Sequence, residues 1–159
     1  MKLKNTVFSF WLPVAILLLT LILMGCSPSS PTDESVFRMS IKNEPPTLDW
    51  NLATDSVSFT ILTNIMEGLT QYDSKLNAQP AIAKKWEYSE DGRTITFFLR
   101  NDATWSDGKP VTAADFEYSW KRLLAPETAS QYAYFLFDIE NAAEYNSGKI
   151  TDPNQVGVR

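Results

Sequence analysis

The stretch WSDGKPVTAADFEYSW, residues 105–120, decides the fold because it joins a tight turn to the start of a helix. Asp107 and Gly108 form an Asp-Gly pair, which is typical of a reversal of the backbone. Thr112, followed three residues later by Asp115, predicts a capping box in which aspartate replaces the usual Glu or Gln. The helix has one apolar stripe at a spacing of three and four residues, made of Phe116, Trp120, Leu123 and Leu124. We therefore expect the two tryptophans of this stretch to be part of the scaffold.

Two hairpins are predicted before this stretch. Strands at 85–88 and 94–100 flank a turn that ends in Asp91-Gly92, and a shorter hairpin joins 69–72 to 75–77. Between the two hairpins, the segment 80–84 is compatible with one helical turn.

The remaining elements follow from the same kinds of signal. Alternating apolar residues predict a strand at 36–41, and Val156 and Val158 look like the start of another. Asp55 is typical of an N-cap, so we expect a helix over 56–67 that stops at Gly68. A second helix is expected over 139–146, closed by Gly148. The fold class is α/β, with α+β character in this part: a mixed sheet with hairpins and flanking helices.

Composition limits the possible functions of the 159-residue chain. A hydrophobic content of 44% with 21% charged residues is typical of a folded globular domain. The net charge of −5 argues against a nucleic-acid partner, since phosphate binding needs a basic face. The chain has no histidine, which excludes Ser–His and Cys–His catalytic pairs and histidine metal ligands, and its single cysteine excludes an intramolecular disulfide.

The N-terminal residues have the layout of a secretory signal peptide. Lys2 and Lys4 precede an almost wholly apolar run from residue 7 to 24, which a membrane-spanning anchor would also explain. The sequence LMGC, residues 23–26, resembles the bacterial lipobox and favours a lipidated Cys26. We therefore expect a lipoprotein signal peptide at 1–25, a flexible tether rich in serine and proline at 26–35, and a folded domain from residue 36 onward.

Several stretches in order resemble the extracytoplasmic solute-binding proteins of family 5, the oligopeptide, dipeptide and nickel class of ABC importers. They are NEPPTLDWN, NIMEGLTQYD, WSDGKPVTAADFEYSWKR, NAAEYNSGK and VGV, and LLAPETASQYA is similar to the oligopeptide-binding branch. The resemblance implies a two-lobed periplasmic-binding-protein-like fold that closes around a peptide. It also implies delivery of the peptide to permease subunits of an ABC importer, a monomer, no cofactor, and a place on the outer face of the bacterial cytoplasmic membrane. Members of this family are much longer, so we expect residues 36–159 to be the N-terminal portion of a solute-binding domain, truncated relative to the family.

The resemblance also implies candidate ligand-binding residues. The loop before the first helix supplies Thr54, Asp55 and Ser56, although Asp55 is also explained as an N-cap alone. The aromatic stretch after the Trp120 helix supplies Tyr132 and Tyr134, which core packing would also explain. No catalytic or metal-ligating residue is assigned, and the chain is not expected to be an enzyme. There are two alternatives. The first is the same scaffold binding a nickel complex, haem or an oligosaccharide, and the second is a cell-surface enzyme or adhesin.

Overall fold

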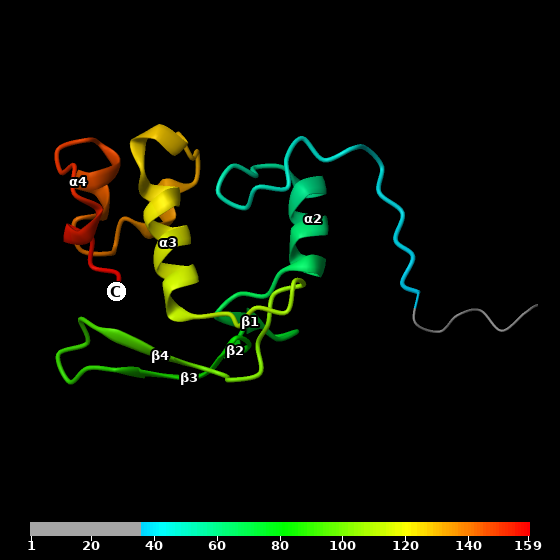
Figure 1. Cartoon of the computed structure of the whole chain (residues 1–159), viewed down its shortest axis with the longest axis horizontal. Helices are drawn as coiled ribbons and strands as arrows, with labels where there is room; N and C mark the ends of the chain where they lie inside the picture. The colour runs from blue at the N-terminus through cyan, green and yellow to red at the C-terminus, as the bar shows by residue number, and fades with distance from the viewer. Residues whose placement is uncertain (1–35) are drawn as a thin grey trace, which may run out of the picture. The chain divides into compact units, whose positions relative to one another are not determined.

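A computed structural model describes residues 36–159 of the chain. Residues 41–159 form one compact unit, and the described residues 36–40 lie outside it. In Figure 1 the strands of this unit lie on one side and its α-helices on the other. The unit therefore combines helices with hairpins, as the sequence predicts.

The secondary structure consists of short elements. The α-helices are α2 (Ser56–Ile65), α3 (Ala113–Leu124) and α4 (Ala142–Asn146). The 3-10 turns are η1 (Pro126–Thr128), η2 (Ala133–Leu136) and η3 (Pro153–Gln155). The strands are β1 (Thr70–Tyr72), β2 (Ala78–Pro80), β3 (Ala83–Tyr88) and β4 (Ile95–Leu99). Strand β1 pairs with β2, and β3 pairs with β4, both antiparallel.

The longer hairpin, β3–β4, confirms the prediction from its Asp-Gly turn. Gly92 has a φ of 68°, a conformation that suits glycine, and its N–H donates to the carbonyl of Ser89. Trp86 lies opposite Phe97 in the register, with ring centroids 6.5 Å apart. Cross-strand aromatic pairs of this kind stabilise an antiparallel ladder.

The shorter hairpin, β1–β2, is confirmed, but its second strand lies later than predicted. Residues 75–77 belong to the turn because the carboxylate of Asp73 accepts the N–H groups of Lys75 (2.8 Å) and Asn77 (2.9 Å). The pairing with β1 therefore begins at Ala78.

The predicted helical turn at 80–84 is wrong. Pro80 ends β2, and the N–H groups of Ile82 and Ala83 donate to the carbonyls of Gly68 and Leu69. The backbone donors of this segment are thus taken by a neighbouring chain segment, so no helical turn forms.

Helix α3 begins at the predicted capping box and ends before Pro126. The carboxylate of Asp115 accepts both the N–H (2.7 Å) and the hydroxyl (2.9 Å) of Thr112. Lys121 forms an ion pair with Glu117 one turn earlier, at 2.5 Å. Ala125, before Pro126, is extended and ends the helix.

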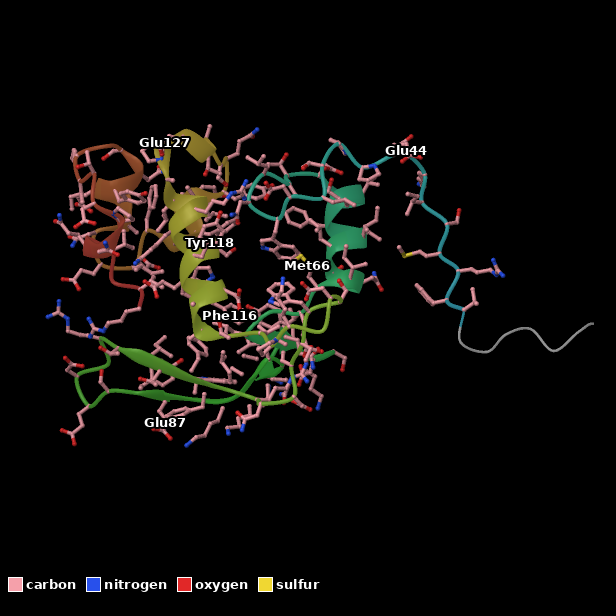
Figure 2. The ribbon with its side chains drawn as sticks, viewed as in Figure 1. Glu44, Met66, Glu87, Phe116, Tyr118 and Glu127 are labelled. Atoms are coloured by element: carbon pink, nitrogen blue, oxygen red, sulfur yellow. The ribbon has the colours of Figure 1, made fainter. Side chains whose placement is uncertain are left out.

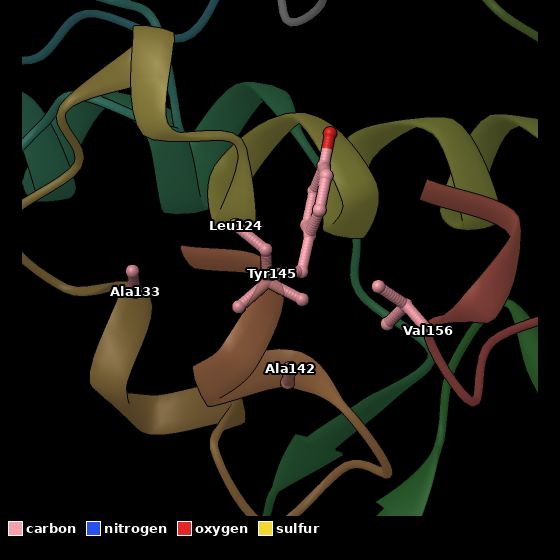
Figure 3. Packing of buried hydrophobic residues seen from close by; sticks show 5 residues of the cluster. All are labelled: Leu124, Ala133, Ala142, Tyr145 and Val156. Carbon is pink, nitrogen blue, oxygen red and sulfur yellow. The ribbon is translucent and has the colours of Figure 1, made fainter. Parts of the chain in front are cut away.

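The hydrophobic core lies where α3, η2 and α4 meet. Its buried residues are Leu124, Ala133, Ala142, Tyr145 and Val156, and Figure 3 shows them converging. The side-chain amide of Asn146 also donates to the carbonyl of Leu124 at 3.0 Å, which satisfies a carbonyl at the end of α3. The end of α3 is therefore fixed by both apolar and polar contacts.

Two helices differ from their predicted bounds. Helix α2 ends at Ile65 because Met66 is already extended. Its buried face is formed by Ser58 and Leu62, whereas Ile65 in the last turn is 64% exposed. Helix α4 begins at Ala142 instead of 139, because Asn141 has a left-handed backbone with a φ of 59°.

Neither terminal strand prediction is confirmed within residues 36–159. Residues 36–41 form no strand, and Phe37 is 79% exposed. Alternation fixes which side chains share a face, but a strand also needs a neighbour to pair with. At the other end, Val156 is buried in the core, and Gly157 donates its N–H to the carbonyl of Glu140.

The loop before α2 is tied to α3 by polar side chains. Arg122 donates from Nη1 to Oδ1 of Asp49 (2.8 Å) and from Nη2 to Oδ2 (2.5 Å). The amide of Asn51 donates to the carbonyl of Ser119 at 3.3 Å. The hydrogen bonds from Arg122, with a further one from the N–H of Asn51, hold the pKa of Asp49 below its usual range, although partial burial opposes the shift.

We expect Leu124→Ala to lower the free energy of unfolding by about 2–5 kcal/mol, because it leaves a cavity at a fully buried position. Urea denaturation followed by circular dichroism measures the change. The matched control is Ile65→Ala, which removes an exposed aliphatic side chain and should stay within about 0.5 kcal/mol of the wild type. Equal effects of the two substitutions would show that the core has been placed wrongly.

Stability should also depend on pH through Asp49. Because the pKa of Asp49 is lower in the folded chain, its carboxylate contributes fully above the unfolded value of about 3.9 and loses this contribution as the pH falls through the folded value. Asp49→Asn should therefore reduce the loss of stability between about pH 5 and pH 3, by about 1 kcal/mol or less because the pair is about a third exposed. Urea unfolding at both pH values measures this, and identical losses in the two proteins would contradict it.

Candidate functional site

An open cavity of about 1100 Å³ is lined by residues of α2, β1, β4, α3 and η2. Met66 after α2 and Phe116 in α3 line it, and both are labelled in Figure 2. Its charged lining residues are Glu67, Arg100 and Asp115. Most of the remaining lining side chains are apolar, which is typical of a ligand-binding cavity.

Five aromatic residues on one wall of this cavity form a connected group, which we call the aromatic cluster: Trp50, Phe59, Tyr132, Tyr134 and Phe135. The rings of Phe59 and Tyr132 are stacked at 6.1 Å, with an interplanar angle of 16°. Trp50 meets Phe59 edge-on at 5.8 Å, and Phe135 meets Tyr132 at 5.5 Å. Such pairs stabilise one another beyond the area they bury.

The aromatic cluster brings two of the predicted ligand-binding segments together. The hydroxyl of Tyr132 donates to the carbonyl of Thr54 at 3.2 Å, across a sequence separation of 78 residues. Tyr134 lies beside Tyr132 with ring centroids 6.2 Å apart. Tyr134 as a whole residue is 54% exposed, and its hydroxyl makes no hydrogen bond within residues 36–159.

Asp55 caps helix α2, which confirms the structural interpretation of this residue. Its Oδ1 accepts the N–H groups of Val57 (3.0 Å) and Ser58 (2.9 Å), and its Oδ2 accepts the hydroxyl of Ser58 (2.6 Å). The hydroxyl of Ser58 and then its N–H lower the pKa of Asp55, so the side chain remains a carboxylate. The residues that line the cavity do not include Thr54, Asp55 or Ser56.

The two tryptophans at 105 and 120 both line the cavity. Trp105 is 41% exposed, and Trp120 is half-buried. Of the stripe predicted to be buried on α3, only Leu124 is buried, whereas Phe116 and Leu123 are half-buried and face the cavity. The stripe therefore divides between the core and the cavity wall.

Sequence reasoning missed three members of the aromatic cluster: Trp50, Phe59 and Phe135. One signal was available for Phe59, which follows the N-cap Asp55 by four residues and so shares its side of α2. The run YAYF at 132–135 was a second signal, because it places three rings within four consecutive residues.

Residues 36–159 contain no group of three or more acidic or cysteine side chains able to hold a metal ion. Within the same range, no helix has both the length and the hydropathy that a membrane crossing requires. Cys26, the signal peptide at 1–25 and the tether at 26–35 lie outside the described residues.

Known proteins resemble this chain over most of its length. The dipeptide-binding protein of Bacillus subtilis (strain 168) is 39% identical over 143 residues, covering 82% of this chain and 26% of the relative. The periplasmic murein peptide-binding protein of Escherichia coli (strain K12) is 43% identical over 120 residues, covering 74% and 22%. A relative from the same strain, 37% identical over 135 residues (84% and 25%), is named a probable deoxycholate-binding periplasmic protein. The chain thus spans about a quarter of the length of the curated relatives it matches.

Solved structures agree with the predicted fold class. The substrate-binding domain of an oligopeptide ABC transporter from Bacillus anthracis str. Ames superposes with a TM-score of 0.73 at 43% identity, covering 76% of this chain and 23% of that one. The OppA protein of Listeria monocytogenes bound to peptide gives a TM-score of 0.69 at 36% identity, covering 72% and 22%. The chain therefore has the mixed helix and sheet of one part of the periplasmic-binding-protein fold.

The family assignment rests on a direct match. The model of the bacterial extracellular solute-binding proteins, family 5 (middle region), matches residues 77–158, which is more than half of the chain. These residues include the β3–β4 hairpin, helix α3 and the core. The chain belongs to the family 5 bacterial extracellular solute-binding proteins.

Proposed function

We propose that the protein captures oligopeptides outside the cytoplasm and delivers them to the permease subunits of an ABC importer. The observation that carries the proposal is the aromatic cluster on the cavity wall, joined to the loop before α2 by the bond from Tyr132 to Thr54. Dipeptide, oligopeptide and murein peptide binding in the names of the relatives supports the choice of ligand. A solute-binding protein of this kind needs no catalytic group.

The two tyrosines differ in what they offer a peptide. The proton of the Tyr132 hydroxyl is engaged by the carbonyl of Thr54, so its oxygen remains as an acceptor for a peptide N–H. The hydroxyl of Tyr134 is able to donate to a peptide carbonyl. Together the pair matches the alternating donors and acceptors of a peptide backbone.

The predicted loop residues act through their positions in this proposal. The carboxylate of Asp55 is occupied by the N-terminus of α2, so its role is to fix the direction of the loop. Thr54 precedes it and accepts the Tyr132 hydroxyl with its carbonyl, and Ser56 follows it as the first residue of α2. Peptide contacts by side chains in this part of the chain come instead from the aromatic cluster.

Another solute on the same scaffold is the main alternative. The relative named for deoxycholate supports a bile-acid-like ligand, because an apolar cavity with few polar groups also suits a sterol. A nickel complex, haem or an oligosaccharide are further alternatives, and an enzyme or adhesin has no support from the family.

Isothermal titration of the full chain with a mixture of peptides of two to nine residues tests the proposal. We expect binding by the wild type and an affinity about 5-fold weaker in Tyr134→Phe, since a neutral hydrogen bond contributes about 1 kcal/mol. The matched control is Tyr88→Phe, because Tyr88 is exposed on β3 and does not line the cavity. Tyr88→Phe should bind peptides like the wild type.

The same titration separates the alternatives. Deoxycholate, haemin, a nickel–histidine complex and a maltooligosaccharide are titrated in parallel arms. Saturable binding of one of these without any peptide binding would overturn the peptide proposal. Equal weakening by Tyr134→Phe and Tyr88→Phe would remove the aromatic cluster from the peptide site.

We also propose that acyl chains on Cys26 hold the protein on the outer face of the bacterial cytoplasmic membrane as a monomer. The support is the LMGC sequence, followed by a tether rich in serine and proline. Each buried methylene of an acyl chain contributes about 0.8 kcal/mol, so more than one chain gives stable anchoring.

Metabolic labelling with an alkyne fatty acid tests the anchor. We expect the wild type to take up the label and to remain with membranes through a carbonate wash. Cys26→Ser should take up no label, because the thiol that carries the acyl chain is gone. A Cys26→Ser protein that still resists the wash after processing would favour a membrane-spanning anchor instead.

A further inference from the structure

The loop before α2 is attached to the part of the unit formed by α3 and η2 at three points. Asp49 is bound by Arg122, Asn51 by Ser119, and the carbonyl of Thr54 by the hydroxyl of Tyr132. The sequence separations of these contacts are 73, 68 and 78 residues. The path of residues 49–54 is therefore set by side chains from a distant part of the chain.

The Arg122–Asp49 contact is the most specific of the three. The two terminal guanidinium nitrogens each donate to one carboxylate oxygen, at 2.8 and 2.5 Å, and this fork fixes an angle as well as a distance. Oδ1 of Asp49 also accepts the N–H of Asn51 at 3.0 Å. The same carboxylate thus folds the local turn and binds it to α3.

The attachment at Thr54 depends on the first two. The hydroxyl of Tyr132 reaches the carbonyl of Thr54 at 3.2 Å, which is a longer bond than either bond of the fork. Only four residues lie between Asp49 and Thr54, so a shift of the turn moves the Thr54 carbonyl away from the Tyr132 phenol. The Tyr132 hydroxyl would then lose its hydrogen bond to Thr54. It could donate to a ligand as well as accept from one.

We propose that Arg122 is a positioning residue for ligand binding, which acts through Asp49 to hold the carbonyl of Thr54 on the Tyr132 hydroxyl. The proposal rests on the peptide-binding function proposed above. Arg122 does not line the cavity, so its effect on a ligand is indirect. Sequence reasoning placed Arg122 in no role.

The test compares Arg122→Met with Lys121→Met in the full chain. Both substitutions remove one positive charge from α3, but Lys121 pairs with Glu117 on its own helix and contacts Asn154, away from the loop. Titration with the peptide mixture should show affinity at least about 10-fold weaker for Arg122→Met and within about 2-fold of the wild type for Lys121→Met. Arg122→Lys keeps the charge without the fork and should recover part of the affinity.

A spectroscopic readout distinguishes positioning from general destabilisation. With 3-fluorotyrosine incorporated at position 132, the ¹⁹F chemical shift of the unliganded protein reports whether the phenol is bonded to Thr54. We expect this shift to change in Arg122→Met, to return partly in Arg122→Lys and to stay unchanged in Lys121→Met. If Arg122→Met does not fold, Asp49→Asn replaces it, because an asparagine oxygen still accepts the N–H of Asn51.

The outcomes separate this inference from the peptide proposal. An unchanged affinity in Arg122→Met, or a lost affinity with an unchanged ¹⁹F shift, overturns the positioning role. A wild type that binds no peptide overturns the peptide proposal. In that case the ¹⁹F shift of Arg122→Met, compared with that of the wild type, still tests whether Arg122 positions the Tyr132 hydroxyl. If Lys121→Met weakens peptide affinity as much as Arg122→Met does, the positioning role is also overturned, because the loss of one positive charge then explains both effects.

Discussion

The bidentate ion pair between Arg122 and Asp49 is the constraint that relates the two helical walls of the cavity. Helix α2 follows directly from the loop that Asp49 begins, and α3 carries Arg122 near its end. A lysine at the same place would supply the charge but not the angle, because only the guanidinium presents a rigid planar fork. The aromatic cluster draws its rings from both sides of this contact, with Trp50 and Phe59 on one side and Tyr132 on the other.

Features encoded by neighbouring residues could be predicted from the sequence. The turn at Gly92, the cap of α2 by Asp55 and the interaction of Thr112 with Asp115 all involve partners within five residues. Each depends on a property that few residue types have. Glycine adopts a positive φ without strain, and the short carboxylate of aspartate accepts nearby backbone N–H groups. Such local interactions do not depend on distant parts of the chain, so the sequence predicts the positions of these elements to within a few residues.

Features that depend on distant partners could not be predicted. The segment at 80–84 has helical composition, yet the backbone of Gly68 and Leu69 takes its N–H groups. Residues 36–41 have the alternation of a strand, but pairing needs a second strand that composition does not reveal. At the site, Tyr132 and Tyr134 were identified through the family resemblance, whereas Trp50 and Phe59 join them only through folding. The residues around an aromatic side chain do not reveal which distant aromatic side chain it will contact.

The charges around the cavity explain why the proposed peptide site would discriminate little between charged and neutral ligands. Arg100 is bonded to Glu67 at 2.8 Å, and the carboxylate of Asp115 is bonded to Thr112. These are all the charged residues of the lining, and each already has its partner within the protein. A ligand side chain entering here meets rings, hydroxyls and amides, so apolar contact and backbone hydrogen bonds decide its affinity. Under the proposed function, broad peptide recognition would follow from this internal pairing of charges, which a selective site would leave free.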